Sequence, residues 1–295
     1  MESADLKIFQ AVAREGSITK AAARLGYVQS NVTARIRHLE AELNTSLLHR
    51  QSRGVSLTPA GENLLKYADK IVHLLDEAVK STRNSETPSG TLRIGSLETT
   101  AAVQLPVMML EYHRSYPDVQ LSLSTGHTSD LVKSVLEYEL DADFVNGPQH
   151  HPDLEELYAF EEEMVLIAEP GETSLQSALA KPQLFFGKGC YHRKTLERWL
   201  QEEHQQSLNS MEFGTLEAIL GGVSAGLGVS LVTRSSVKTW EEAGKISVLP
   251  IPEKYRRSVV SFVFRRDLFR TSAFNAFVEL MSRFSAQGAA NAISG

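Results

Sequence analysis

Residues 27–40, YVQSNVTARIRHLE, combine an apolar stripe with short polar and basic side chains that could bind a nucleic acid. Val32, Ile36 and Leu39 recur at helical spacing, which predicts an α-helix with one buried face. The remaining arc carries mainly short or hydrogen-bonding side chains: Ser30, Asn31, Thr33, Ala34, Arg37 and His38. Short side chains allow close approach, and asparagine and arginine can contact base edges or phosphates. A solvated amphipathic helix explains the same pattern, so the flanking segments are needed to distinguish the two.

The segments before this helix predict a helix-turn-helix. Residues 5–14 have apolar positions at helical spacing, and Gly16 is a suitable C-terminal stop. Ser17 can cap a second helix over residues 18–25, and Gly26 supplies a tight turn. Short helices that lead through a glycine turn into a helix with a polar front form this motif, whose second helix enters the major groove.

The segment after the helix predicts a small two-stranded wing. Leu47 and Leu48 are apolar, residues 55–57 alternate, and residues 49–54 form a polar, cationic turn between them. Arginines in such a turn could lie along phosphates or in the minor groove. A solvated hairpin with incidental charge remains an equal alternative from this pattern alone.

Residues 17–61 resemble the winged helix-turn-helix of LysR-type transcriptional regulators. The match rests on these residues: Ala21, Ala22, Leu25, Gln29, Ile36, Leu39, Glu40, Leu43, Leu47, Arg50, Leu57, Thr58 and Gly61. This pattern is far more specific than a generic helix-turn-helix, and the similarity extends over the whole chain. The resemblance implies binding to double-stranded DNA.

Carried over by position, the resemblance implies these DNA-contacting residues: Gln29, Ser30, Asn31, Thr33, Arg35, Arg37, Arg50 and Arg53. The sequence departs from the family pattern at two places. Val28 stands where the family usually has a serine that caps the helix and contacts phosphate, and Ala34 stands where a basic residue is frequent. We therefore expect the small polar residues of this helix to read bases and its arginines to contact the DNA backbone.

The charge is unevenly distributed along the 295 residues. The net charge is −6, yet residues 1–58 hold eight Lys and Arg against five Asp and Glu, so the remainder carries the acidic excess. A basic head on an acidic body suits a chain that touches a polyanion at one end. The sequence has no run of about 18 apolar residues and no secretory signal, so we expect a cytoplasmic protein without a membrane span.

A long helix is predicted from residue 62 to about residue 83. Its apolar stripe has nearly heptad spacing and consists of Leu64, Ala68, Ile71, Leu75 and Val79, widened by Leu65 and Val72. Such a stripe suits pairing with a second copy, although packing on its own domain is the alternative. The resemblance agrees with a dimer and implies a tetramer. A two-fold dimer presents two reading helices, so we expect a DNA site with dyad symmetry.

The remaining residues predict an α/β body. Strands at 91–96, 119–124 and 141–146 alternate with helices at 99–116, where Pro106 could introduce a kink, and at 129–138. This order predicts a parallel doubly wound sheet. A second unit follows, with strands at 164–168 and 184–186 and helices at 193–203 and from 215. A strand at 258–265 and a helix at 272–285 then return to the first unit.

The domain organisation follows from these elements. We expect a DNA-binding domain at 1–58, a linker helix and hinge at 59–90, and an effector domain at 91–295. The effector domain should have one lobe from 91–161 plus about 255–295 and another from about 162–254. Two crossovers near 161–163 and 250–254 join the lobes, as in a periplasmic binding protein, which matches the LysR-type effector domain by resemblance.

Polar residues follow two neighbouring strands at 96–100 and 125–128. Ligands of doubly wound sheets bind at such strand ends, beside helix N-termini, although helix capping explains any single residue equally well. The resemblance implies that a small-molecule effector contacts Ser96, Thr99, Thr100, Thr125, Thr128, Asn146 and Thr215. Glu98 complicates the ligand's identity, because its carboxylate could repel an anion or accept hydrogen bonds from an amine or hydroxyl.

Other chemistry is not supported. The histidines lack metal-ligand spacing, nucleophile motifs such as G-x-S-x-G are absent, and no cofactor motif is complete. Cys190, the only cysteine, excludes an intrachain disulfide and is expected to be a small buried side chain. The acidic runs at 155–156 and 161–163 are expected to be solvated surface.

We therefore expect a regulator, not an enzyme, whose DNA binding responds to an effector and affects recruitment of RNA polymerase. A solute-binding module or an enzyme built on the α/β body is the competing class, and residues 1–90 argue against it. A purely architectural DNA-binding protein is a third possibility, which leaves the two-lobed body without a role.

Overall fold

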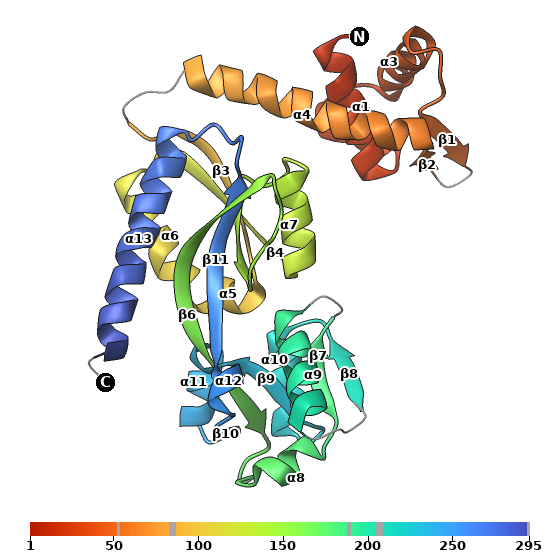
Figure 1. The fold of residues 1–295 in the computed structure, drawn as a ribbon. Coiled ribbons are helices and arrows are strands. Elements are labelled where there is room, and N and C mark those ends of the chain that lie inside the picture. The colour runs from red at the N-terminus through yellow and green to blue at the C-terminus, as the bar shows by residue number, and fades with distance from the viewer. Residues whose placement is uncertain (52–53, 83–86, 188–189, 204–208, 294–295) are drawn as a thin grey trace. The chain divides into compact units, whose positions relative to one another are not determined.

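The computed structural model describes residues 1–51, 54–82, 87–187, 190–203 and 209–293. The chain forms two compact units, Met1–Arg83 and Asn84–Gly295 (Figure 1). The first unit contains the helix-turn-helix and wing expected from the sequence. The second is an α/β unit, as also expected.

Three helices and a hairpin make the head of the first unit: α1 Ser3–Glu15, α2 Ile18–Leu25, α3 Gln29–Glu42, β1 Leu48–Gln51 and β2 Gly54–Leu57. Gly16 and Gly26 end α1 and α2 in the left-handed conformation, which suits glycine. The Ser17 side chain caps α2 by accepting a hydrogen bond from the Lys20 N–H. The buried stripe of α3, Val32, Ile36 and Leu39, packs into the core shared by these elements.

The long helix α4, Pro59–Thr82, packs on α1 through its N-terminal half. Ala68 and Val72 are buried in the core of their own unit, so the predicted pairing seam is wrong at its centre. The sequence could not reveal this because α1 covers that face only in the folded unit. The large apolar side chains that remain exposed on α4 are Tyr67 (65%), Leu74 (59%), Leu75 (39%) and Val79 (50%).

The first lobe of the second unit is built on three parallel strands, β3 Gly90–Ser96, β4 Val119–Thr125 and β5 Ala142–Asn146. Helices α5 Glu98–Val103, α6 Leu105–Ser115 and α7 Thr128–Leu136 connect them. The single helix predicted at 99–116 is therefore two helices that meet at Gln104. Pro106 lies in the first turn of α6, where its missing N–H costs no intrahelical hydrogen bond.

The strand β6, Leu154–Ala168, runs through both lobes. Residues 154–163 pair with β11, Arg257–Arg265, and residues 164–168 pair with β9, Ser230–Thr233, and β10, Ser247–Leu249. The predicted strand at 164–168 was thus ten residues too short. Exposed acidic residues such as Glu161 and Glu163 alternate with buried positions and obscure the apolar pattern of this half.

The second lobe adds two strands and several helices: α8 Leu175–Leu179, β7 Gln183–Phe186, α9 Tyr191–Glu203, β8 Ser210–Phe213, α10 Leu216–Ser224, α11 Arg234–Glu242 and α12 Glu253–Arg256. The strands β7 and β8 are parallel neighbours. The chain then returns through β11 to the first lobe, where β11 lies antiparallel to β5.

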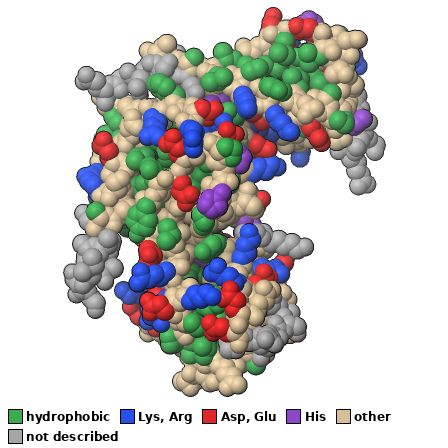
Figure 2. Space-filling view, viewed as in Figure 1, with side chains coloured by type: hydrophobic (Ala, Val, Ile, Leu, Met, Phe, Trp, Pro, Cys, Tyr) green, Lys and Arg blue, Asp and Glu red, His purple; other side chains and the backbone are tan. Residues whose placement is uncertain are grey.

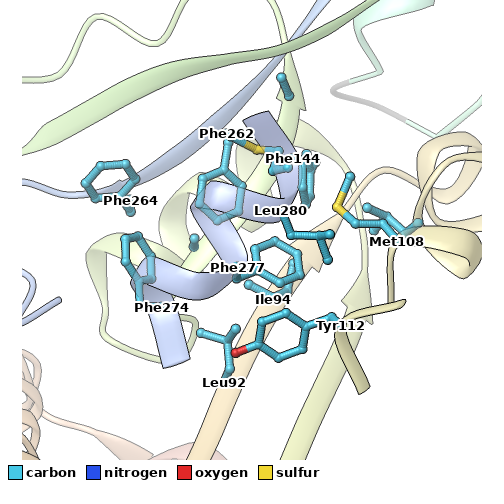
Figure 3. Packing of buried hydrophobic residues seen from close by; sticks show 14 of the residues in the cluster. Leu92, Ile94, Met108, Tyr112, Phe144, Phe262, Phe264, Phe274, Phe277 and Leu280 are labelled. Atoms are coloured by element: carbon cyan, nitrogen blue, oxygen red, sulfur yellow. The ribbon is translucent and has the colours of Figure 1, made fainter. Parts of the chain in front are cut away.

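The last helix, α13 Ser272–Ile293, covers the sheet of the first lobe with aromatic side chains (Figure 3). Phe262 of β11 lies between Phe144 of β5 and Phe277 of α13, with ring centroids 4.9 and 5.7 Å away. The Tyr112 hydroxyl of α6 donates a hydrogen bond to the Ala273 carbonyl at 2.7 Å. These contacts hold α6 and α13 against the sheet whose strand ends carry the polar residues.

Two aspartates at the start of β5 have opposite environments. Asp141 accepts hydrogen bonds from the Arg93 backbone N–H at 2.7 Å and from its guanidinium Nη2 at 2.8 Å. Asp143 is fully buried on the same face as Val145, and neither of its carboxylate oxygens has a partner among the described residues. Burial raises the pKa of Asp143 well above its ordinary value.

We predict that Asp143→Asn stabilises the second unit at pH 8. A carboxyl whose folded-state pKa is raised stabilises the fold only when it is protonated. That contribution is lost as pH rises above the ordinary aspartate pKa of about 3.9. The variant should raise the free energy of unfolding in urea by about 1–3 kcal/mol at pH 8, with a smaller gain at pH 5.

Asp141→Asn is the matched control, because it weakens a satisfied ion pair two residues away. It should lower stability at both pH values. Equal stability of the wild type and Asp143→Asn at pH 8 would show that the carboxyl has a partner or is solvated.

Candidate functional site

The exposed front of α3 brings together four residues that the sequence singles out. Gln29, Ser30 and Asn31 are exposed in its first turn, and Thr33 is half-buried behind them. The Thr19 hydroxyl of α2 donates to Gln29 Oε1 at 3.2 Å, and the Thr33 hydroxyl donates to the Gln29 carbonyl at 2.9 Å. These bonds orient the start of α3, and Ser30 and Asn31 have their side chains in solvent.

The two arginines of α3 differ in their surroundings. The Arg35 guanidinium donates to Asp5 Oδ1 at 2.9 Å and to Glu2 Oε2 at 3.0 Å, both at the start of α1. These hydrogen bonds raise the pKa of Arg35 and hold its side chain against α1. Asp5 is 1% exposed, so Arg35 neutralises a buried charge, a role that the sequence did not reveal. Arg37 is exposed on the opposite side of the helix.

Val28 occupies the N-cap of α3 in an extended conformation. Its side chain forms no capping hydrogen bond and is 69% exposed. The Val28 carbonyl accepts hydrogen bonds from Asn31 N–H at 3.1 Å and Val32 N–H at 3.3 Å. The backbone at the entry of the helix is therefore fixed even though a capping hydroxyl is missing.

The wing is tied to α3 by one carboxylate. Glu40 Oε1 accepts hydrogen bonds from the backbone N–H groups of Leu47 at 2.9 Å and Leu48 at 3.2 Å, where β1 begins. The strands β1 and β2 pair in antiparallel register, with Arg50 opposite Val55. The side chain of Arg50 and the whole of Arg53, two of the predicted contacts, lie outside the described residues.

A cavity of about 180 Å³ lies between the two lobes of the second unit. It is lined from the first lobe by Leu97, Glu98, Thr99, Thr125, Gly126, His127 and Asn146, and from the second by Phe186, Cys190, Tyr191, His192 and Gly214. Of the seven residues predicted to bind an effector, three line this cavity: Thr99, Thr125 and Asn146.

The other four predicted residues lie beside the cavity and do not line it. Ser96 is fully buried and donates to the Leu97 carbonyl at 3.1 Å. Thr100 is fully buried, Thr128 is half-buried at the first position of α7, and Thr215 caps α10 through a bond from the Ala218 N–H. Helix capping accounts for Thr215, whereas the buried hydroxyls of Thr100 and Thr128 have no hydrogen-bond partner among the described residues.

Four lining side chains from the second lobe were missed: Phe186, Cys190, Tyr191 and His192. Phe186 ends β7, Cys190 precedes α9, and Tyr191 and His192 begin that helix. A search of strand ends for aromatic as well as polar residues could have found them. Cys190, expected to be a small buried side chain, is half-buried and contributes to the cavity wall. Burial raises the pKa of its thiol, which therefore stays protonated at neutral pH.

Asn146 and His192 form the buried polar floor of the cavity. Asn146 Nδ2 lies 3.2 Å from His192 Nε2, and the two residues are 3% and 4% exposed. Burial lowers the pKa of His192 to about 4, so its ring is neutral at pH 7. If Nε2 accepts from the amide, Nδ1 carries the proton. Asn146 Oδ1 and His192 Nδ1 are buried and have no hydrogen-bond partner among the described residues.

Glu98 forms a hydrogen bond across the cleft. Its Oε1 accepts from the backbone N–H of Leu216, the first residue of α10 in the second lobe, at 3.1 Å. A carboxylate at a helix N-terminus is stabilised by the unpaired N–H groups and by the helix dipole. Glu98 therefore joins the two lobes at the edge of the cavity.

A second carboxylate joins the lobes where β6 crosses between them. Glu162 is 5% exposed and accepts hydrogen bonds from Gln104 Nε2 at 3.2 Å and from the Ser235 hydroxyl at 2.8 Å. Burial raises the pKa of this carboxyl. The expectation of solvated surface is wrong for Glu162 but holds for Glu161 and Glu163. Figure 2 shows acidic and basic side chains interspersed over the neighbouring surface around α11 and α12.

The described part of the chain contains no group of three or more His, Cys, Asp or Glu side chains arranged to hold a metal ion. Within those same residues, no helix is both long and apolar enough to cross a membrane.

Two family descriptions match the chain. Residues 3–62 match "Bacterial regulatory helix-turn-helix protein, lysR family", and residues 85–285 match "LysR substrate binding domain". The chain is 51% identical over 279 residues to the uncharacterized HTH-type transcriptional regulator YusT of Bacillus subtilis, covering 95% of each protein. It is 53% identical over 274 residues to the HTH-type transcriptional regulator YofA of Bacillus velezensis, covering 93% of this chain and 95% of that protein.

The fold is also that of a solved regulator. Full-length CbnR, crystallised with its target DNA, superposes with a TM-score of 0.68 at 24% identity, over 96% of this chain and all of CbnR. The two domain matches, the relatives that align over nearly the whole chain, and the fold all indicate the same family. Together they favour a transcriptional regulator over an enzyme or a solute-binding module. The chain therefore belongs to the LysR family of DNA-binding transcriptional regulators, with a helix-turn-helix followed by a substrate-binding domain.

Proposed function

We propose that two copies of this chain pair through α4 and bind a DNA site of dyad symmetry, and that an effector bound between the lobes alters this binding. In this proposal residues 1–58 read DNA, residues 59–90 pair the copies, and residues 91–295 bind the effector. The observation that carries the effector part of this proposal is the cavity, which has walls from both lobes and is lined by buried Asn146 and His192, each with a polar atom that lacks a partner among the described residues.

The DNA-reading role of α3 rests on its exposed front. Asn31 and Ser30 offer hydrogen-bonding groups at the end of the helix that approaches base edges in this motif. Arg37 is exposed and suits a phosphate contact, whereas Arg35 is held by two carboxylates of α1. We assign Arg35 to positioning α3 on α1, and we retain Gln29, Thr33, Arg50 and Arg53 as proposed contacts.

Pairing through α4 rests on the apolar side chains left exposed on that helix. Tyr67 and Leu74 are seven residues apart and lie on the side of α4 opposite Ala68 and Val72. A second α4 packed there would remove both side chains from water. Two such dimers would form the tetramer that the family resemblance implies.

Effector control rests on the two carboxylates that join the lobes. A ligand on the cavity floor lies beside Glu98, so it can change the contact between Glu98 and α10. The short helix α5 begins at Glu98 and is followed by Gln104, which binds Glu162 at the crossover. Movement of α5 would therefore displace Gln104 and change its contact with Glu162 at the crossover. In this proposal, the change between the lobes alters the arrangement of the paired copies on DNA. The altered arrangement then changes recruitment of RNA polymerase.

Arg37→Ala should weaken DNA binding about equally on a preferred site and on random duplex, and should reduce the salt dependence by about one phosphate contact. The measurement is fluorescence anisotropy at several salt concentrations, on duplexes selected from a random pool. Asn31→Ala should instead lose affinity mainly on the preferred site. Equal losses on both kinds of DNA for Asn31→Ala would contradict base reading.

Arg35→Ala should lower the melting temperature of the first unit, because Asp5 is left buried without its partner.

Leu74→Glu should shift the protein towards monomer, raising the dimer dissociation constant at least tenfold. A charge at this position would have to be removed from water on pairing. Light scattering after size-exclusion chromatography measures the change. Lys66→Glu, also exposed on α4 but away from the Tyr67–Leu74 side, is the control. A dimer that survives Leu74→Glu unchanged would place the pairing surface elsewhere.

Glu98→Ala should speed amide hydrogen exchange at Leu216 about tenfold or more, because that N–H loses a charged acceptor. Hydrogen exchange of the full chain without ligand reads this contact directly. Glu217→Ala removes an exposed acid from the same first turn of α10 and should leave Leu216 unaffected. Unchanged exchange in Glu98→Ala would mean that the lobes are not joined at this point in solution.

A further inference from the structure

The entry of α3 carries two large apolar side chains that are exposed to solvent. Val28 is 69% exposed and Tyr27 is 46% exposed, immediately before Gln29 and Ser30. By contrast Val32, one turn further, is fully buried in the core of the unit. Val28 therefore contributes nothing to the core that is described, and as an N-cap it has no oxygen to offer the helix.

The position of Val28 is nevertheless well defined. Its carbonyl accepts hydrogen bonds from the Asn31 and Val32 N–H groups, so its backbone is fixed at the first turn. A β-branched side chain on a fixed backbone has few rotamers. The isopropyl group is therefore presented in one direction at little entropic cost, which is what a specific contact requires.

The neighbouring groups restrict what this surface can recognise. Thr33 uses its hydroxyl on the Gln29 carbonyl, Ala34 is an exposed methyl group, and Arg35 is held by Asp5. The first two turns of α3 thus lack a free arginine for guanine. In the major groove, thymine is the base with an exposed methyl group, and apolar side chains recognise it there.

We propose that Val28 is a specificity-determining residue whose isopropyl group contacts the 5-methyl group of a thymine in each half-site. The inference rests on the proposed function, in which the N-terminal end of α3 approaches base edges in the major groove. It goes beyond that function by naming the base and the chemical group that one side chain reads.

The test replaces thymine by deoxyuridine, which removes only the methyl group. Duplexes are first selected from a random pool with the full-length wild-type protein. Each thymine of the preferred site is then replaced singly, and affinity is measured by fluorescence anisotropy at one salt concentration. At one position in each half-site, uracil should weaken wild-type binding about fourfold, the value of one buried methyl-sized group.

Val28→Ala should remove most of that penalty, so that thymine and uracil bind about alike at this position. Val28→Ser should do the same while supplying a capping hydroxyl, which separates loss of the apolar contact from loss of helix stability. Lys7→Ala, exposed on α1, is the matched control and should retain the full uracil penalty. Val28 is exposed, so circular dichroism should show all three variants folded.

A uracil penalty of the same size in wild type and in Val28→Ala would overturn the inference, as would no penalty at any thymine. Tight and sequence-specific binding in those cases would leave the proposed DNA-reading function intact. Failure of the wild type to select any sequence would overturn both.

Discussion

The ladder between β6 and β11 is the constraint on which the second unit depends. Its register runs from Arg257 opposite Glu163 to Arg265 opposite Leu154, and β6 then continues into the second lobe beside β9 and β10. Every buried N–H and carbonyl of such a strand needs a partner, so the backbone of β6 cannot break between the lobes without loss of hydrogen bonds. The hydrogen-bonded backbone of β6 is therefore continuous from the first lobe into the second.

Besides this continuous strand, two buried or half-buried carboxylates connect the lobes through hydrogen bonds. Glu98 and Glu162 add hydrogen bonds between the lobes to the connection that β6 provides. Both carboxylates bridge the lobes, and one short helix, α5, lies between their contacts. The cavity floor, with its neutral His192 and an Asn146 oxygen that has no partner among the described residues, lies beside the first of these contacts.

The first unit uses charge in two distinct ways. Arg14 and Arg35 pair with buried Asp69 and Asp5 and hold the helices together, while Arg37 is left in solvent. The net positive charge of residues 1–58 therefore includes arginines that are already paired within the unit and are not available to bind a polyanion.

The sequence by itself determined the helix-turn-helix, the wing, the parallel first sheet and the family, because these depend on local periodicity, glycine turns and caps that each segment carries. The family resemblance named Thr99, Thr125 and Asn146, and these three line the cavity because the ends of neighbouring parallel strands meet at one edge of the sheet. Only the tertiary structure decided that Ala68 is core and Tyr67 is not, that Arg35 is held by Asp5, and that Glu162 is buried among acidic neighbours. Those outcomes depend on which segments, distant in the sequence, cover a given side chain, and periodicity along one segment contains no information about that cover.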